Sequence, residues 1–144
     1  MRTHPYLRAY MAGIVVPTLF LLVIMLVNAY QRYYFEVSSQ FVLGFSTAPL
    51  ERALLFPMAI VPNVWGLWNV VHLALKSRVR WPLGVHGALL VCILMPAGIL
   101  LARTLDAFTI QWGFALPMLP IGMAVYYLAW KYFVGFLNGE MGIA

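Results

Sequence analysis

The chain has 144 residues, of which 64% are hydrophobic and 9% are charged, and its mean hydropathy is +0.89. This composition lies outside the range of soluble globular proteins, and the length fits a single domain. The formal net charge of +5 does not indicate a nucleic-acid-binding protein, because the cationic residues flank apolar segments instead of forming a run.

Four segments carry no charged residue and run for 22 to 24 residues, which is long enough for a helix to cross a bilayer. We therefore expect an all-α integral membrane protein in which residues 1–144 form one domain of four transmembrane helices. The expected spans are about 10–30, 53–75, 83–102 and 113–130, and the outer loop is 31–52. Each expected span contains at least one proline, so the sequence predicts a proline-kinked bundle.

The positions of the cationic residues predict an orientation. Six of them flank the spans on one expected side: Arg2, Arg8, Lys76, Arg78, Arg80 and Lys131. The two outer connections mix acidic and basic residues. The positive-inside rule therefore places both termini and the connection between the second and third spans in the cytoplasm. We expect a bacterial inner (plasma) membrane protein that contacts the lipid bilayer and no nucleic acid.

Residues 10–30 form the most uniformly apolar span, which suits a lipid-exposed position. At the start of the outer loop, tyrosines at 30, 33 and 34 are typical of an interfacial aromatic belt. The segment FVLGF at Phe41–Phe45 is too short to span and too apolar for water. It could lie along the interface, dip back into the membrane or cap the bundle.

The second span differs from a lipid-facing helix because one side of it is polar. At 100° per residue, one arc of about 120° holds six residues: Pro62, Trp65, Trp68, Asn69, His72 and Lys76. Because an unsatisfied polar group in hydrocarbon costs several kcal/mol, this side should face protein or a water-filled cavity. It is either a helix–helix interface or a ligand or solute path. The candidates to line such a path are Trp65, Trp68, Asn69, His72 and also Asn63, which points largely elsewhere.

The two histidines of the spans are expected at similar depth. His72 lies four residues before Lys76, and His86 lies six after Arg80, so they sit about 6 and 9 Å below the flanking cations on adjacent helices. His72 and His86 are therefore candidates to bind a haem or a quinone, or to bond lipid phosphate or a carbonyl. Two histidines without a third ligand fit zinc poorly. Apart from a haem or quinone here, we expect no cofactor, and we expect no metal site.

The remaining tryptophans and the C-terminal tail also have the features expected of a membrane protein. Trp81, Trp112 and Trp130 fall at expected interfaces, where tryptophan is enriched. The tail 132–144 is apolar enough to continue the fourth helix or to lie on the membrane. The single cysteine, Cys92, excludes an intramolecular disulfide and a multi-cysteine metal site.

No hydrolytic or group-transfer motif is present, so we expect no catalytic residue and favour a protein that is not an enzyme. All four acidic residues lie outside the expected spans, whereas a proton-coupled antiporter usually carries an ionisable group inside the bilayer. The sequence favours a non-catalytic subunit, assembly factor or scaffold, working as a homo-oligomer or with other membrane subunits. Two alternatives stay open: an oligomeric channel or carrier for a small solute, lined by the polar side of the second span, and a haem- or quinone-binding redox subunit.

Overall fold

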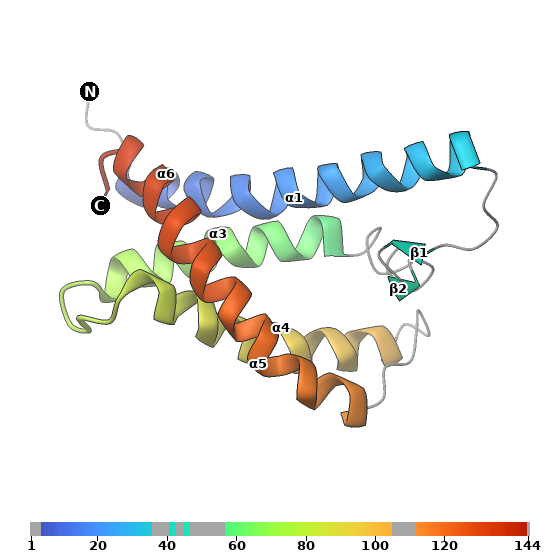
Figure 1. Ribbon diagram of the computed structural model, residues 1–144. Coiled ribbons are helices and arrows are strands. Elements are labelled where there is room, and N and C mark those ends of the chain that lie inside the picture. Colours follow the sequence, from blue (N-terminus) through green and yellow to red (C-terminus); the bar gives the residue numbers. More distant parts are fainter. Residues whose placement is uncertain (1–3, 36–40, 43–44, 47–56, 105–111, 144) are drawn as a thin grey trace.

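The computed structural model describes residues 4–35, 41–42, 45–46, 57–104 and 112–143. This part of the chain is almost entirely helical (Figure 1). Its elements, in chain order, are α1 (Pro5–Phe35), β1 (Phe41–Val42), β2 (Phe45–Ser46), α3 (Pro57–Leu75), α4 (Leu83–Thr104), α5 (Trp112–Ala129), the π-helical turn η1 (Trp130–Val134) and α6 (Gly135–Glu140).

The long helices pack as two antiparallel pairs. α1 lies along α3, and α4 lies along α5 (Figure 1). The two pairs approach each other at the end that holds the start of α1, and they diverge toward the end that holds β1 and β2. From α5 the chain continues through η1 and α6 without a break, and this continuation crosses to the start of α1. α6 thus connects the second pair to the first.

Glycines allow both helix pairs to approach closely. A Cβ atom on Gly13 of α1 would lie 2.6 Å from the carbonyl oxygen of Trp65 in α3. Gly66, the next residue of α3, lies against the side chain of Tyr10 in the same way. In the second pair, a Cβ atom on Gly87 of α4 would lie 2.5 Å from the carbonyl oxygen of Tyr126 in α5. At both crossings backbone rests on backbone, so neither has room for a larger residue.

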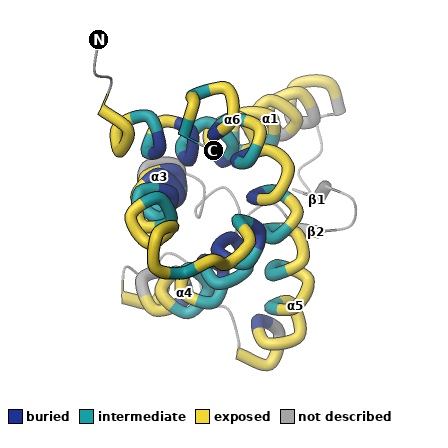
Figure 2. Tube along the Cα trace, turned by 90° about the vertical axis from the view of Figure 1, so that its left-hand side faces the viewer, coloured by how far each residue is buried: buried dark blue, intermediate teal, exposed yellow. Residues whose placement is uncertain are grey.

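The buried core lies where the two pairs meet. It is built from Trp65 of α3, Leu90 of α4, and Trp130 and Val134 of η1. Val16 of α1 packs against its edge. Buried residues face this centre, while the outward faces of the helices are exposed along most of their length (Figure 2). The core is therefore small, and much apolar surface lies outside it.

Two parts of the expected outer loop form regular secondary structure. α1 continues to Phe35, because no glycine or proline interrupts residues 31–35, so Tyr33 and Tyr34 lie on its last turns and not in a loop. Phe41 and Val42 of the FVLGF segment pair antiparallel with Ser46 and Phe45, respectively. The placement of this segment relative to a membrane stays a prediction. The rest of the expected loop, and residues 53–56 of the expected second span, lie outside the described residues.

The prolines of the spans do not end their helices. Pro17, Pro62 and Pro96 lie inside α1, α3 and α4, and Pro117 and Pro120 lie inside α5. Two helices, at Pro5–Val27 and Leu83–Leu100, are long and apolar enough to cross a bilayer, and the apolar helix Ile60–Leu75 is shorter. A helical architecture is confirmed for the described residues, with the two-residue strands β1 and β2 as the exception.

Candidate functional site

The polar side of α3 faces the interior of the protein and is centred on Asn69, which has no exposed surface. The Asn69 Nδ2 atom donates to the carbonyl oxygen of Ala9 at 2.7 Å and to Oδ1 of Asn138 at 2.8 Å. Asn138 Nδ2 donates back to Asn69 Oδ1 at 3.2 Å. Both donors and the acceptor of the Asn69 amide are used, and they join α1, α3 and α6.

The end of α6 is also bonded to the start of α1. The Arg8 Nη1 atom donates to the carbonyl oxygen of Met141 at 2.6 Å. Gly142 follows with φ 64°, a conformation that favours glycine, and Ile143 N–H then donates to the carbonyl oxygen of Asn138 at 2.9 Å. These bonds satisfy carbonyl groups at a helix end and hold the C-terminal segment against α1.

Aromatic rings fill the space beside Asn69. The Trp65 ring lies 4.9 Å from the ring of Tyr126 and 5.5 Å from the ring of Trp130, measured between centroids. Trp130 is completely buried, so it does not face outward as a residue of an interfacial aromatic belt would. The cause is the core at this end, where Trp130 packs between α3 and the glycine-lined surface of α4 at Gly87.

The histidines of α3 and α4 are in contact. The rings of His72 and His86 meet edge to face, with their centroids 4.4 Å apart and their planes at 76°. His86 is 2% exposed and His72 is half-buried. The buried atoms Nδ1 of His72 and Nε2 of His86 have no hydrogen-bond partner in the described part of the chain. Trp68 Nε1 donates to the carbonyl oxygen of His86 at 2.8 Å, and the Trp81 ring lies 6.0 Å from the His86 ring.

This ring separation tests the haem hypothesis. A metal–nitrogen bond of about 2 Å puts an imidazole centroid about 3 Å from the metal, so two ligands on opposite sides of one iron lie about 6 Å apart. At 4.4 Å, the rings of His72 and His86 do not leave room for a haem iron between them. Among the described residues, no three or more His, Cys, Asp or Glu side chains group in a way that could hold a metal ion.

The five candidates to line a path do not share one surface. Trp65, Trp68, Asn69 and His72 all contact other helices of the same chain. Asn63 is exposed and accepts a hydrogen bond on Oδ1 from the Tyr10 hydroxyl. The polar side of α3 therefore serves as an interface between helices of this chain, which is one of its two expected roles.

Sequence reasoning missed Asn138 as a member of this polar cluster. The signal available was a spacing of four residues that runs from Tyr126 through Trp130 and Val134 to Asn138. This spacing continues the inward side of the fourth span into the tail.

Comparison with known protein families, curated proteins and solved structures finds no match to this chain.

Proposed function

We propose that this protein is a four-span integral membrane protein that acts as a non-catalytic subunit or scaffold within a homo-oligomer or a larger membrane complex. The observation that carries the proposal is that polar groups are bonded inside the chain while apolar side chains cover its outside. Trp68 and Asn69 of α3 bond to other parts of the same chain, whereas many large apolar side chains of the helices are exposed. Lipid, or the apolar surface of another membrane helix, is the environment that suits such surfaces.

The exposure of α1 supports a membrane environment. Only 17% of its most apolar stretch is buried inside the chain, and Phe20 and Leu26 are 65% and 61% exposed. A core helix of a soluble protein would instead be mostly buried. Exposed aliphatic residues continue on the other helices, including Leu67 of α3, Ile93 of α4 and Ile121 of α5.

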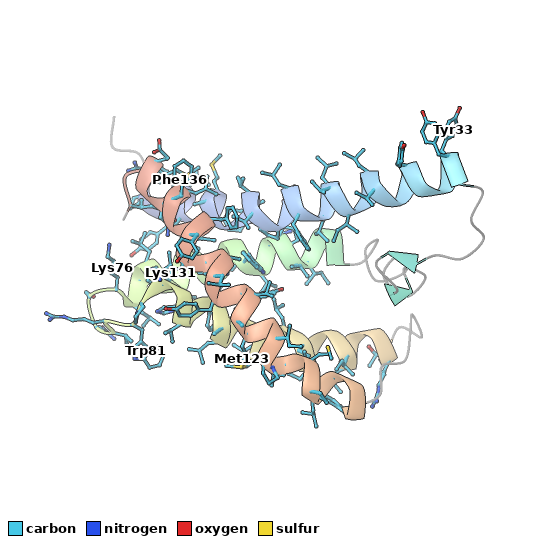
Figure 3. The ribbon with its side chains drawn as sticks, viewed as in Figure 1. Tyr33, Lys76, Trp81, Met123, Lys131 and Phe136 are labelled. Atoms are coloured by element: carbon cyan, nitrogen blue, oxygen red, sulfur yellow. The ribbon has the colours of Figure 1, made fainter. Side chains whose placement is uncertain are left out.

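Exposed aromatic residues concentrate near the two ends of the helices, as expected at two membrane interfaces. At the end with the start of α1 they are Tyr6, Trp81, Tyr132, Phe133 and Phe136, and at the opposite end they are Tyr30, Tyr33, Tyr34 and Trp112. Tyr33 lies at the opposite end from Trp81 and Phe136 (Figure 3). Along α1, Tyr6 and Tyr30 are separated by about 36 Å of helix, which suits a bilayer core with its interfaces.

The distribution of cations supports the proposed orientation. The start of α1, the connection between α3 and α4 and the end of α6 lie at the same end of the molecule (Figure 1). This end carries the exposed residues Lys76, Arg78 and Arg80. By the positive-inside rule it faces the cytoplasm, as we propose for both termini.

The channel or carrier proposal has less support. A solute path along α3 would have to displace the hydrogen bonds that saturate Asn69. Flux through liposomes that responds to Asn69→Leu or His72→Ala would favour it. The redox proposal rests on the unpartnered nitrogens of His72 and His86, and it now predicts a bound quinone that His72→Ala removes.

The experiment that tests the proposed function is gentle extraction of the tagged protein from its own membranes, followed by native mass spectrometry. We expect either a small multiple of 16.3 kDa or a complex with other polypeptides. A monomer without partners would contradict the proposal. Release of the chain from membranes by alkaline carbonate would contradict its integral placement.

A further inference from the structure

The contact between His72 and His86 leaves chemistry that the fold does not use. Both rings have a buried nitrogen without a partner in the described part of the chain. The side chain of His86 is almost completely buried, with 2% of its surface exposed. An unsatisfied buried polar atom costs about 1–3 kcal/mol relative to a bonded one, so a ligand that bonds to this pair would be stabilised. His72 is half-buried, so part of its side chain reaches the surface beside this contact.

The nature of such a ligand follows from what an imidazole offers. Each neutral ring has one N–H donor and one acceptor nitrogen. With the protons on Nδ1 of His72 and Nε2 of His86, both buried atoms are donors, which the oxygens of an anion can accept. With the opposite tautomers they are acceptors, and a metal cation would satisfy them.

Charge favours the anionic ligand. Lys76 follows His72 by four residues, which places the two on the same side of the end of α3. Arg78 and Arg80 follow in the same connection, and both are exposed. Among the described residues the only acidic side chain is Glu140, which lies on α6. A divalent cation would be repelled by this surrounding charge, whereas a phosphate would be stabilised.

We propose that His72, His86 and Lys76 bind the phosphate group of an anionic phospholipid in the cytoplasmic leaflet. This inference rests on the membrane placement proposed above. In that placement, the ring of Trp81 beside His86 is 53% exposed at the interface, where lipid headgroups lie. Basic sites between membrane helices on the cytoplasmic side are suited to anionic headgroups.

Titration of the detergent-solubilised full chain with phosphatidylglycerol, read by native mass spectrometry, tests the proposal. Phosphatidylcholine serves as the competing neutral lipid. We expect one tightly held phosphatidylglycerol per chain. Lys76→Gln and His72→Leu should each weaken its binding about tenfold, the loss expected for one charge-assisted hydrogen bond. His72→Gln, which keeps an N–H donor, should retain more binding than His72→Leu.

Lys131→Gln is the matched control, because it removes one exposed positive charge from η1 near the same end of the molecule. It should leave the affinity unchanged. Equal losses in Lys76→Gln and Lys131→Gln would show diffuse charge attraction and overturn the proposal. The proposal is also overturned if neither Lys76→Gln nor His72→Leu weakens the binding of phosphatidylglycerol. Lys76 is exposed, so its variant is informative even where His72→Leu fails to fold.

Two further arms separate other occupants. Displacement of the lipid by excess inorganic phosphate would show that a soluble phosphate is the ligand. Retention of Zn²⁺ that His72→Leu removes would show a metal site. Either result overturns the lipid proposal. Membrane placement is read separately by carbonate extraction, so a chain that stays in the membrane but lacks lipid selectivity contradicts this inference and not the proposed function.

Discussion

Asn69 and Asn138 exchange two side-chain hydrogen bonds, at 2.8 and 3.2 Å, between the middle of the chain and its tail. Both residues are buried. Because each amide satisfies the other, the pair fixes the position of α6 against α3, and the additional bond from Asn69 to Ala9 brings α1 into the same cluster.

The first prediction concerns this pair. Asn138→Leu should lower the free energy of unfolding by about 1–3 kcal/mol, because it leaves the buried amide of Asn69 short of partners. Thermal unfolding in detergent measures the loss. In a double-mutant cycle, Asn69→Leu and Asn138→Leu together should cost less than the sum of the single variants.

Gly139→Ala is the control for Asn138→Leu, because a Cβ atom at Gly139 meets no other atom within 4 Å. It should leave the protein as stable as the wild type or slightly more so, since alanine favours a helix. Additive losses in the double-mutant cycle would contradict the coupling of the two amides.

The second prediction concerns the close crossing of α1 and α3. Gly13→Ala should destabilise the protein by about 1–3 kcal/mol, because the new methyl group meets backbone atoms of α3 that cannot rotate away. Gly98→Ala in α4 meets nothing within 4 Å and should be neutral or stabilising. Melting temperatures of the two variants provide the test. Equal values would contradict the close backbone contact between α1 and α3 at Gly13.

The third prediction concerns the contact between α3 and α4. Trp68→Phe removes the hydrogen bond from the indole to the carbonyl oxygen of His86. We expect a loss of about 0.5–1.5 kcal/mol, together with the cost of the smaller ring. Trp81→Phe, at an exposed position, should change stability little. Chemical unfolding of both variants would show whether the difference exists.

The fourth prediction concerns orientation. In a Cys92→Ala background, a single cysteine at Ser77 should react with a membrane-impermeant maleimide only from the cytoplasmic side. A cysteine at Tyr33, which is 80% exposed at the other end of the molecule, should react only from the outside. Labelling of intact cells and of inverted vesicles provides the measurement. Reaction of both positions from the same side would contradict the proposed orientation.

The sequence predicts the long helices well because uncharged runs bounded by charges are a strong signal. It also predicts that His72 and His86 lie at similar depth, since the distance of each from the flanking cations follows from the helix rise alone, and their rings are in contact in the structure.

The role of the tail could not be predicted in the same way. Trp130 is equally suited to an interface and to a core, and only packing against α4 decides between them. Asn138 lies beyond the last expected span, and its partner is 69 positions away, so no local pattern joins the two. The end of α1 was missed because the tyrosines that favour an interface are also compatible with a helix.

The π-helical turn η1 has a consequence for the faces of the last helix. At its end, the N–H of Gly135 bonds to the carbonyl oxygen of Trp130, five residues earlier. Such a turn accommodates one extra residue, which rotates everything after it by about 100° relative to a regular helix. The inward face of α6 is thus set independently of the face that α5 presents to α4. Loss of a single residue within 130–134 would turn Asn138 away from Asn69 and separate the tail from α3 while leaving every other helix unchanged in sequence.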